Sequence, residues 1–127
     1  MAFDWAEFLA VAEYLHTTSA PSCTREALLR SVVGRAYYAA YGVAKQYAAQ
    51  HLSFRIHGEP DDHARLPRRL ISSGLPFAGT RLQRLRDWRN ECDYANVVDD
   101  LEGTAVEALE RARLIIDELA ARQPPSR

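Results

Sequence analysis

Apolar residues recur at helical spacing in four long segments, and no segment shows the alternation typical of a β-strand. The pattern predicts long helices over 4–16, 24–51, 80–95 and 99–121, and a short one over about 61–72. Glycine and proline interrupt the chain between 52 and 79, where Pro67 suits a helix only in its first turn. Amphipathic helices with short connections predict an all-α fold, an up-and-down bundle of four to five helices.

The segment 24–51 is apolar on two adjacent faces. A stripe this wide predicts burial on two sides, as for a central bundle helix or one that also meets a second subunit. Tyr37 and Tyr41 lie within the stripe, whereas Tyr38 points about 100° away and is expected to reach a polar partner. The length predicts one domain over 1–121, followed by a flexible tail over 122–127.

The charge is unevenly distributed although the formal net charge is only -1. Residues 65–89 hold seven arginines and one acid, whereas residues 90–127 carry a net charge of -5. Guanidinium groups bind phosphates bidentately and stack on bases. We therefore expect a local basic surface for RNA or a nucleotide, formed by Arg81, Arg84, Arg86 and Arg89. The alternative is a solvated face balanced by the acidic last helix.

Other features point to a cytoplasmic protein without a metal or cofactor. The two cysteines form no metal-binding pair, and the acidic start of the chain is unlike a signal peptide. No stretch reaches the ~20 apolar residues that cross a membrane. The polar loop from His57 to His63 holds potential ligands, yet a turn-rich loop explains it without a metal.

Arg89 occupies an apolar position of its helix, in line with Leu82, Leu85 and Cys92. An inward guanidinium is unfavourable unless it is paired. Asp93 lies one turn later, and Arg35 on the long helix could share its carboxylate. The three residues would then form either a buried structural network or part of a functional site.

Two segments resemble HEPN-domain proteins. Arg30-Ser-Val-Val-Gly-Arg-Ala-Tyr-Tyr-Ala-Ala-Tyr41 is similar to the family's long-helix signature, and Arg89-Asn-Glu-Cys-Asp-Tyr94 is similar to its second motif. The resemblance covers roughly residues 3–120. It implies a helical bundle that forms a homodimer. It also implies either a ribonuclease, often a toxin, or a partner of a nucleotidyltransferase in a toxin–antitoxin or defence context.

In the nuclease members, an Arg followed by four to six residues and then a His forms a metal-independent RNA-cleaving site across the dimer. Carried over, Arg89 and Asn90 match, but Tyr94 stands where the His is expected. Tyrosine, with a pKa of about 10, is a poor base at neutral pH. Five helical residues also rotate Tyr94 by about 140° from Arg89, so the two share a face only if the helix ends or a second protomer intervenes.

Three functions remain open at this stage. The favoured one is a binding module that dimerises and takes RNA, a nucleotide or a nucleotidyltransferase. The second is an active endoribonuclease using Arg89, Asn90 and Tyr94 or Asp93. The third is a purely structural bundle in which Arg35, Arg89 and Asp93 hold the helices in register.

Overall fold

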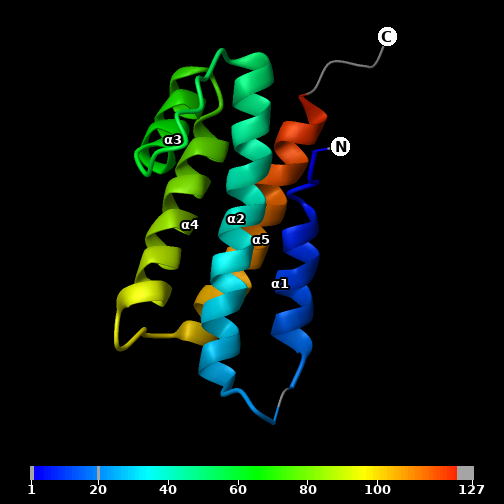
Figure 1. The fold of residues 1–127 in the computed structure, drawn as a ribbon, viewed down its shortest axis with the longest axis vertical. Coiled ribbons are helices and arrows are strands. Elements are labelled where there is room, and N and C mark those ends of the chain that lie inside the picture. Colours follow the sequence, from blue (N-terminus) through cyan, green and yellow to red (C-terminus); the bar gives the residue numbers. More distant parts are fainter. Residues whose placement is uncertain (1, 20, 123–127) are drawn as a thin grey trace.

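The computed structural model describes residues 2–19 and 21–122. Its helices are α1 (Glu7–Thr17), α2 (Arg25–His51), α3 (Asp62–Ser72), α4 (Pro76–Tyr94) and α5 (Leu101–Ala121). Helices α1, α2, α4 and α5 run up and down alongside one another, and α3 covers one end of α4 (Figure 1). No strand occurs among the described residues. The predicted all-α bundle is confirmed, whereas most of the predicted tail, 123–127, lies outside the described residues.

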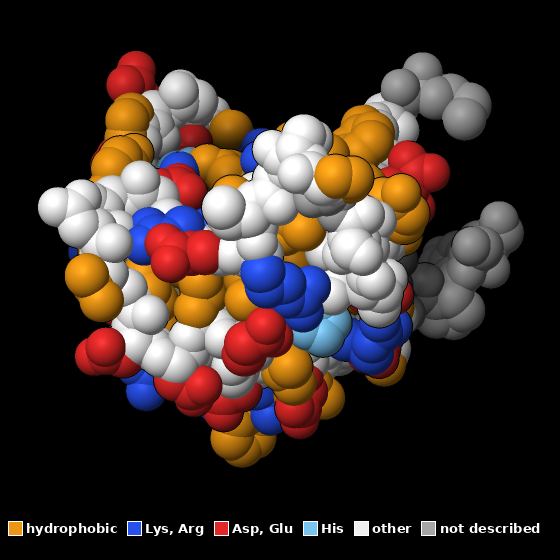
Figure 2. Space-filling view, turned by 90° about the horizontal axis from the view of Figure 1, so that it is seen from below, with side chains coloured by type: hydrophobic (Ala, Val, Ile, Leu, Met, Phe, Trp, Pro, Cys, Tyr) orange, Lys and Arg blue, Asp and Glu red, His pale blue; other side chains and the backbone are white. Residues whose placement is uncertain are grey.

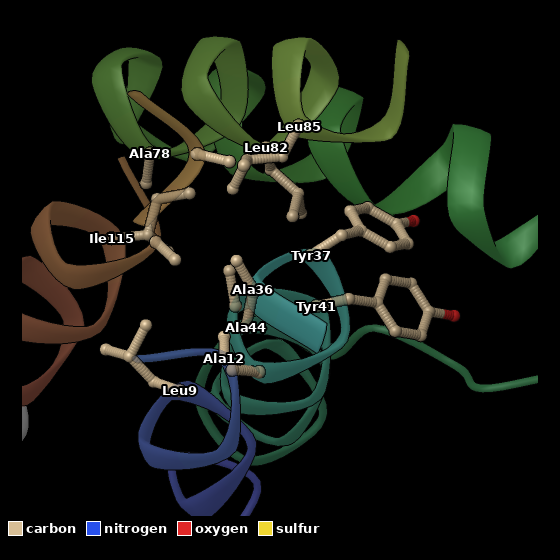
Figure 3. Packing of buried hydrophobic residues seen from close by; sticks show 14 of the residues in the cluster. Leu9, Ala12, Ala36, Tyr37, Tyr41, Ala44, Ala78, Leu82, Leu85 and Ile115 are labelled. Atoms are coloured by element: carbon tan, nitrogen blue, oxygen red, sulfur yellow. The ribbon is translucent and has the colours of Figure 1, made fainter. Parts of the chain in front are cut away.

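Helix α2 is the centre of the bundle and packs against each of the other four helices. Both of its predicted apolar faces are buried, apart from the half-buried Val43. Around it, Figure 3 shows side chains of α1, α4 and α5, including Leu9, Leu82 and Ile115. Helices of the same chain therefore account for the wide stripe, without a second subunit.

Close packing against Trp5 requires glycine at position 42 of α2. A Cβ at Gly42 would lie 2.2 Å from the Trp5 ring, so only glycine lets this indole lie directly against the helix. Trp5 is held from the other side by Phe3 and Phe8, whose ring centroids lie 5.2 and 5.7 Å from its own.

Helix α4 begins at Pro76, four residues before the predicted start, with the proline in its first turn. Gly79 lies inside the helix and does not break it. Close packing against α3 requires glycine at this position, since a Cβ there would lie 2.6 Å from the carbonyl oxygen of Pro67. Pro67 itself lies in the interior of α3, so the expectation of a first-turn proline is wrong. Its ring is fully buried, which compensates for the hydrogen bond that it cannot donate.

Side chains cap two of the long helices. Thr24 accepts a hydrogen bond from the backbone N–H of Ala27 at 3.1 Å, and Asp100 accepts one from Gly103 at 3.2 Å. Asp100 is therefore the N-cap residue of α5. None of the described helices combines the length and apolar character needed to cross a membrane.

Candidate functional site

A hollow of about 580 Å³ lies between α2, α4 and the segment that leads into α3. We call it the α2–α4 pocket. Its cationic lining residues are Lys45, Arg86 and Arg89. Its aromatic lining residues are Trp5, Tyr38, Tyr41, His63 and Tyr94. The pocket thus places positive charge beside planar rings, a combination that suits phosphate-bearing ligands with a base.

Arg89 is held in place by polar groups on two helices. Its Nη2 donates to the Tyr38 hydroxyl at 2.5 Å and its Nη1 to the Asn90 side-chain oxygen at 2.7 Å. Its Nε lies 3.1 Å from Asp93 Oδ2, an ion pair without the alignment of a hydrogen bond. The guanidinium also lies 5.2 Å from the Tyr38 ring centroid. These contacts orient a cation at the pocket wall with only 18% of its side chain exposed.

The expected three-residue network is incomplete. Arg35 makes no ion pair with Asp93 among the described residues, because its guanidinium lies over the rings of Phe8 and Tyr38 at 4.8 and 5.3 Å. The Asp93 side chain is 42% exposed, so its pair with Arg89 is not a buried one. The structure therefore corrects the prediction of a buried Arg35–Asp93–Arg89 network.

Another arginine takes the structural role on this side of the bundle. Arg30 donates to the carbonyl oxygens of Cys92 and Ala95 at 2.9 and 2.7 Å. It thereby satisfies carbonyls at the end of α4, where the helix dipole also favours a cation. No spacing rule could have indicated this contact, because 62 and 65 residues separate the partners along the chain.

The four arginines predicted to share one basic surface lie on two flanks of α4. Arg86 and Arg89 line the α2–α4 pocket, whereas Arg81 and Arg84 line a second hollow beside Arg111 of α5. The reason is the helical turn of about 100° per residue, which puts Arg84 about 140° from Arg89. At the end of the bundle with the α1–α2 and α4–α5 connections, basic and acidic side chains are likewise intermixed (Figure 2).

Tyr94 lies at the rim of the α2–α4 pocket. Tyr94 is the last residue of α4, so the helix does not end between it and Arg89, and the two residues remain about 140° apart around the helix axis. Tyr94 nevertheless lines the same hollow as Arg89 and Asn90, and the residue is 77% exposed. One protomer alone therefore brings the three predicted motif residues to a single pocket.

The pocket also contains a histidine that the motif spacing did not predict. His63 Nδ1 lies 2.5 Å from the hydroxyl of Tyr37, and its ring stacks on Tyr41 with centroids 4.0 Å apart. Tyr37 is fully buried, and burial holds its pKa above the ordinary value for tyrosine, so the phenol keeps its proton. Because that proton needs an acceptor, we assign Nδ1 of neutral His63 as the acceptor and Nε2 as the protonated nitrogen.

Burial, reinforced by the nearby charges of Arg89 and Arg86, lowers the pKa of His63 below its usual range. His63 is therefore neutral at pH 7, with an Nε2–H that can donate to an anion. The nearest sequence signal was its place in the crowded polar loop, which did not indicate that α3 brings it to Arg89.

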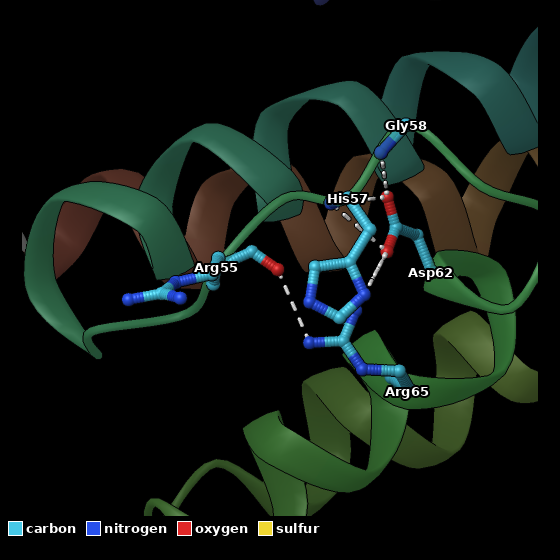
Figure 4. Close-up of polar contacts among 5 residues, drawn as sticks. All are labelled: Arg55, His57, Gly58, Asp62 and Arg65. Atoms are coloured by element: carbon cyan, nitrogen blue, oxygen red, sulfur yellow. Dashed lines mark hydrogen bonds and ion pairs between the residues drawn. The ribbon is translucent and has the colours of Figure 1, made fainter.

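Asp62 holds this loop against the start of α3. It accepts hydrogen bonds from the backbone N–H of Gly58 at 2.9 Å and of His57 at 3.1 Å, and from Arg65 at 2.6 Å (Figure 4). Burial alone would raise the pKa of Asp62, but these N–H groups and the guanidinium outweigh it and lower the pKa. The side chain next to His63 is thus a fixed anion that shapes one wall of the pocket.

The same loop offers the only geometry in the described residues that resembles a metal site. Ligand atoms of His57, Asp61 and Asp62 lie within 4.8 Å of one another. However, Asp62 already accepts from two backbone groups and from Arg65, whose charge would repel a cation. The arrangement serves the loop rather than a metal.

Comparison with protein-family models, with curated proteins and with solved structures found no match to this chain. The chemistry of the pocket is therefore the basis for a function. It offers three cations, of which Arg89 is fixed by hydrogen bonds, together with aromatic rings and one neutral histidine. These groups can bind an anion and stack a base.

Proposed function

We propose that the protein binds RNA or a nucleotide in the α2–α4 pocket. The observation that carries this proposal is that Lys45, Arg86 and Arg89 line the same hollow as several aromatic rings. Phosphate recognition needs cations, and base recognition in flexible strands relies on stacking. Both requirements meet here within one pocket.

In the α2–α4 pocket, the cations would bind the phosphate and the aromatic rings would stack on the base. Arg89 presents a guanidinium already oriented by Tyr38 and Asn90, so binding loses little of its conformational entropy. Lys45 lies 5.0 Å from the Trp5 ring centroid, which places a cation next to a stacking surface. Tyr94, exposed at the rim, offers a second ring. A nucleotide would place its phosphate on the cations and its base against Trp5 or Tyr94.

The resemblance to HEPN proteins supports this proposal and extends it. It adds a homodimer and a nucleotidyltransferase partner, in a toxin–antitoxin or defence setting. Light scattering at micromolar concentration tests the dimer, because a monomer there contradicts this part of the proposal. Co-purification with a small nucleotidyltransferase encoded beside this chain tests the partner.

Calorimetry with uridine monophosphate tests the pocket. We expect Arg89→Gln and Arg86→Gln each to weaken binding about tenfold, because each removes a charge-assisted contact to phosphate. Arg55→Gln is the matched control, since Arg55 is exposed and lies outside the lining. Equal affinities for all three variants would refute the proposal.

A second candidate function is metal-independent RNA cleavage. It is favoured by one observation, that His63 shares the pocket with Arg89 and so brings a titratable group near a phosphate-binding cation. The Tyr37 hydrogen bond occupies Nδ1, so neutral His63 would stabilise charge on the phosphate by donating a hydrogen bond from Nε2 rather than act as a base. RNA cleavage in EDTA that is lost in both Arg89→Gln and His63→Gln would establish it. Intact RNA after long incubation would exclude it.

A further inference from the structure

The outer flank of α4 carries a second cluster of arginines and rings, separate from the α2–α4 pocket. We propose that this cluster, the outer α4 surface, binds single-stranded nucleic acid. It is formed by Phe77, Arg81, Arg84 and Trp88 of α4 and by Arg111 of α5. The proposal goes beyond the function of the pocket and does not depend on it.

Rings and guanidinium groups alternate along this flank. The four α4 residues follow one another at steps of four, three and four, which keeps them on one stripe about 16 Å long. Arg81 lies over the Phe77 ring at 5.4 Å. Arg84 and Arg111 both lie over Trp88, at 5.5 and 4.9 Å. A guanidinium that stacks on a ring is held flat, which leaves its N–H edges available to phosphate oxygens.

The exposure of the rings suggests how a strand would lie. Phe77 is 67% exposed. It lines a hollow of about 460 Å³ together with Thr80 and the three arginines. Trp88 is only half-buried and is flanked by two guanidinium groups. A base could therefore stack on Phe77 while the adjoining phosphates meet Arg81, Arg84 and Arg111.

Charge on this flank remains positive after its ion pairs are considered. Arg81 lies 3.7 Å from Glu118, and Arg111 lies 3.7 Å from Glu107. Such long, partly exposed pairs contribute little and leave the cations able to exchange partners. Arg84 has no carboxylate within ion-pair distance among residues 2–19 and 21–122. It is the cation best able to receive a phosphate.

Nucleic acid fits this surface better than another protein does. Protein interfaces have an apolar centre, whereas here one exposed ring stands among guanidinium groups. A two-fold contact between copies would bring six arginines together, which repel one another. A nucleotide strand instead supplies both planar rings and negative charges, which complement the rings and the guanidinium groups of this surface.

Fluorescence anisotropy of a labelled ten-nucleotide oligouridylate tests the proposal. We expect Phe77→Leu to weaken binding about fivefold or more and Phe77→Tyr to preserve it, because stacking needs a ring and not only an apolar side chain. Arg84→Gln should lower the slope of log affinity against log salt by about 0.7, the value for one phosphate contact on a single strand. Arg55→Gln removes an equal charge elsewhere and should change neither property.

The two tryptophans separate this surface from the pocket. Trp5 lines the α2–α4 pocket and Trp88 belongs to the outer surface, and the chain has no other tryptophan. In a Trp5→Phe variant, the oligonucleotide should change Trp88 fluorescence, and adding Arg84→Gln should shift the midpoint of that change to higher oligonucleotide concentration.

The pattern of variants that lose oligonucleotide binding distinguishes the outer α4 surface from the α2–α4 pocket. Loss of binding only in Arg89→Gln would overturn the outer surface and leave the pocket proposal intact. Loss only in Phe77→Leu and Arg84→Gln would do the reverse. If Phe77→Leu alters the oligomeric state but not oligonucleotide affinity, the surface is a contact between copies and the inference is wrong.

Discussion

Arg89→Gln separates a binding role of Arg89 from a structural one. The substitution removes the donors to Tyr38 and Asn90, the ion pair with Asp93 and the stacking on the Tyr38 ring. It leaves the apolar neighbours on α4 in place. The stability that is lost can therefore be worked out from these contacts.

The expected loss of unfolding free energy is about 1–3 kcal/mol. A hydrogen bond to a charged group contributes about 1.5–3 kcal/mol when it is buried, and a half-exposed ion pair contributes about 0–1 kcal/mol. Stranding a buried charge would cost about 3–5 kcal/mol. That penalty does not apply, because Asp93 is 42% exposed and remains hydrated once Arg89 is removed.

Thermal unfolding followed by circular dichroism measures this loss, which should lower Tm by roughly 3–10 °C in a domain of this size. Asp93→Asn is the matched control: it removes the ion pair but keeps the guanidinium and its donors, so it should cost less than about 1 kcal/mol and preserve nucleotide binding. If Arg89→Gln loses more than about 4 kcal/mol, or if Asp93→Asn is equally damaging, the pair is structural and this reasoning is refuted.

Four further predictions concern the groups around the pocket. Asp62→Ala should cost about 2–3 kcal/mol in urea unfolding, because it removes the buried carboxylate that accepts from two backbone N–H groups and from Arg65; no loss would contradict this role. Since folding lowers the pKa of His63, its contribution to stability is complete above the ordinary value of about 6.5 and is lost as the pH falls through the folded value. Tm should therefore fall between pH 7 and 5 in the wild type and less in His63→Gln; parallel curves would disprove this. Tyr37→Phe should raise the pKa of His63 in an NMR titration, because the hydrogen bond that favours neutral imidazole is removed, and an unchanged pKa would contradict the assigned tautomer. Gly42→Ala should cost about 1–3 kcal/mol in thermal unfolding and shift Trp5 fluorescence, since its Cβ would overlap the indole; an unshifted spectrum would refute the contact.

The periodicity of apolar residues was sufficient to predict the helices because burial of one face governs each of them. It predicted burial of α2 on two sides, which fits the central position of this helix. It failed between 52 and 79, where glycine and proline were interpreted as breaks. The contact between α3 and α4 requires Gly79 and buries Pro67, and local preference contains no information about such a contact.

Helical spacing and a local motif are properties of neighbouring residues, so they were sufficient to predict an all-α bundle and to identify Arg89, Asn90 and Tyr94 as motif residues. Which charges and rings meet in space depends on how the helices pack. The tertiary structure brought His63 from α3 to Arg89, replaced Arg35 by Tyr38 as a neighbour of that guanidinium, and divided the basic segment between two flanks. These outcomes depend on the packing of helices far apart in the chain and on the rotation of α4, and no spacing along the sequence records either.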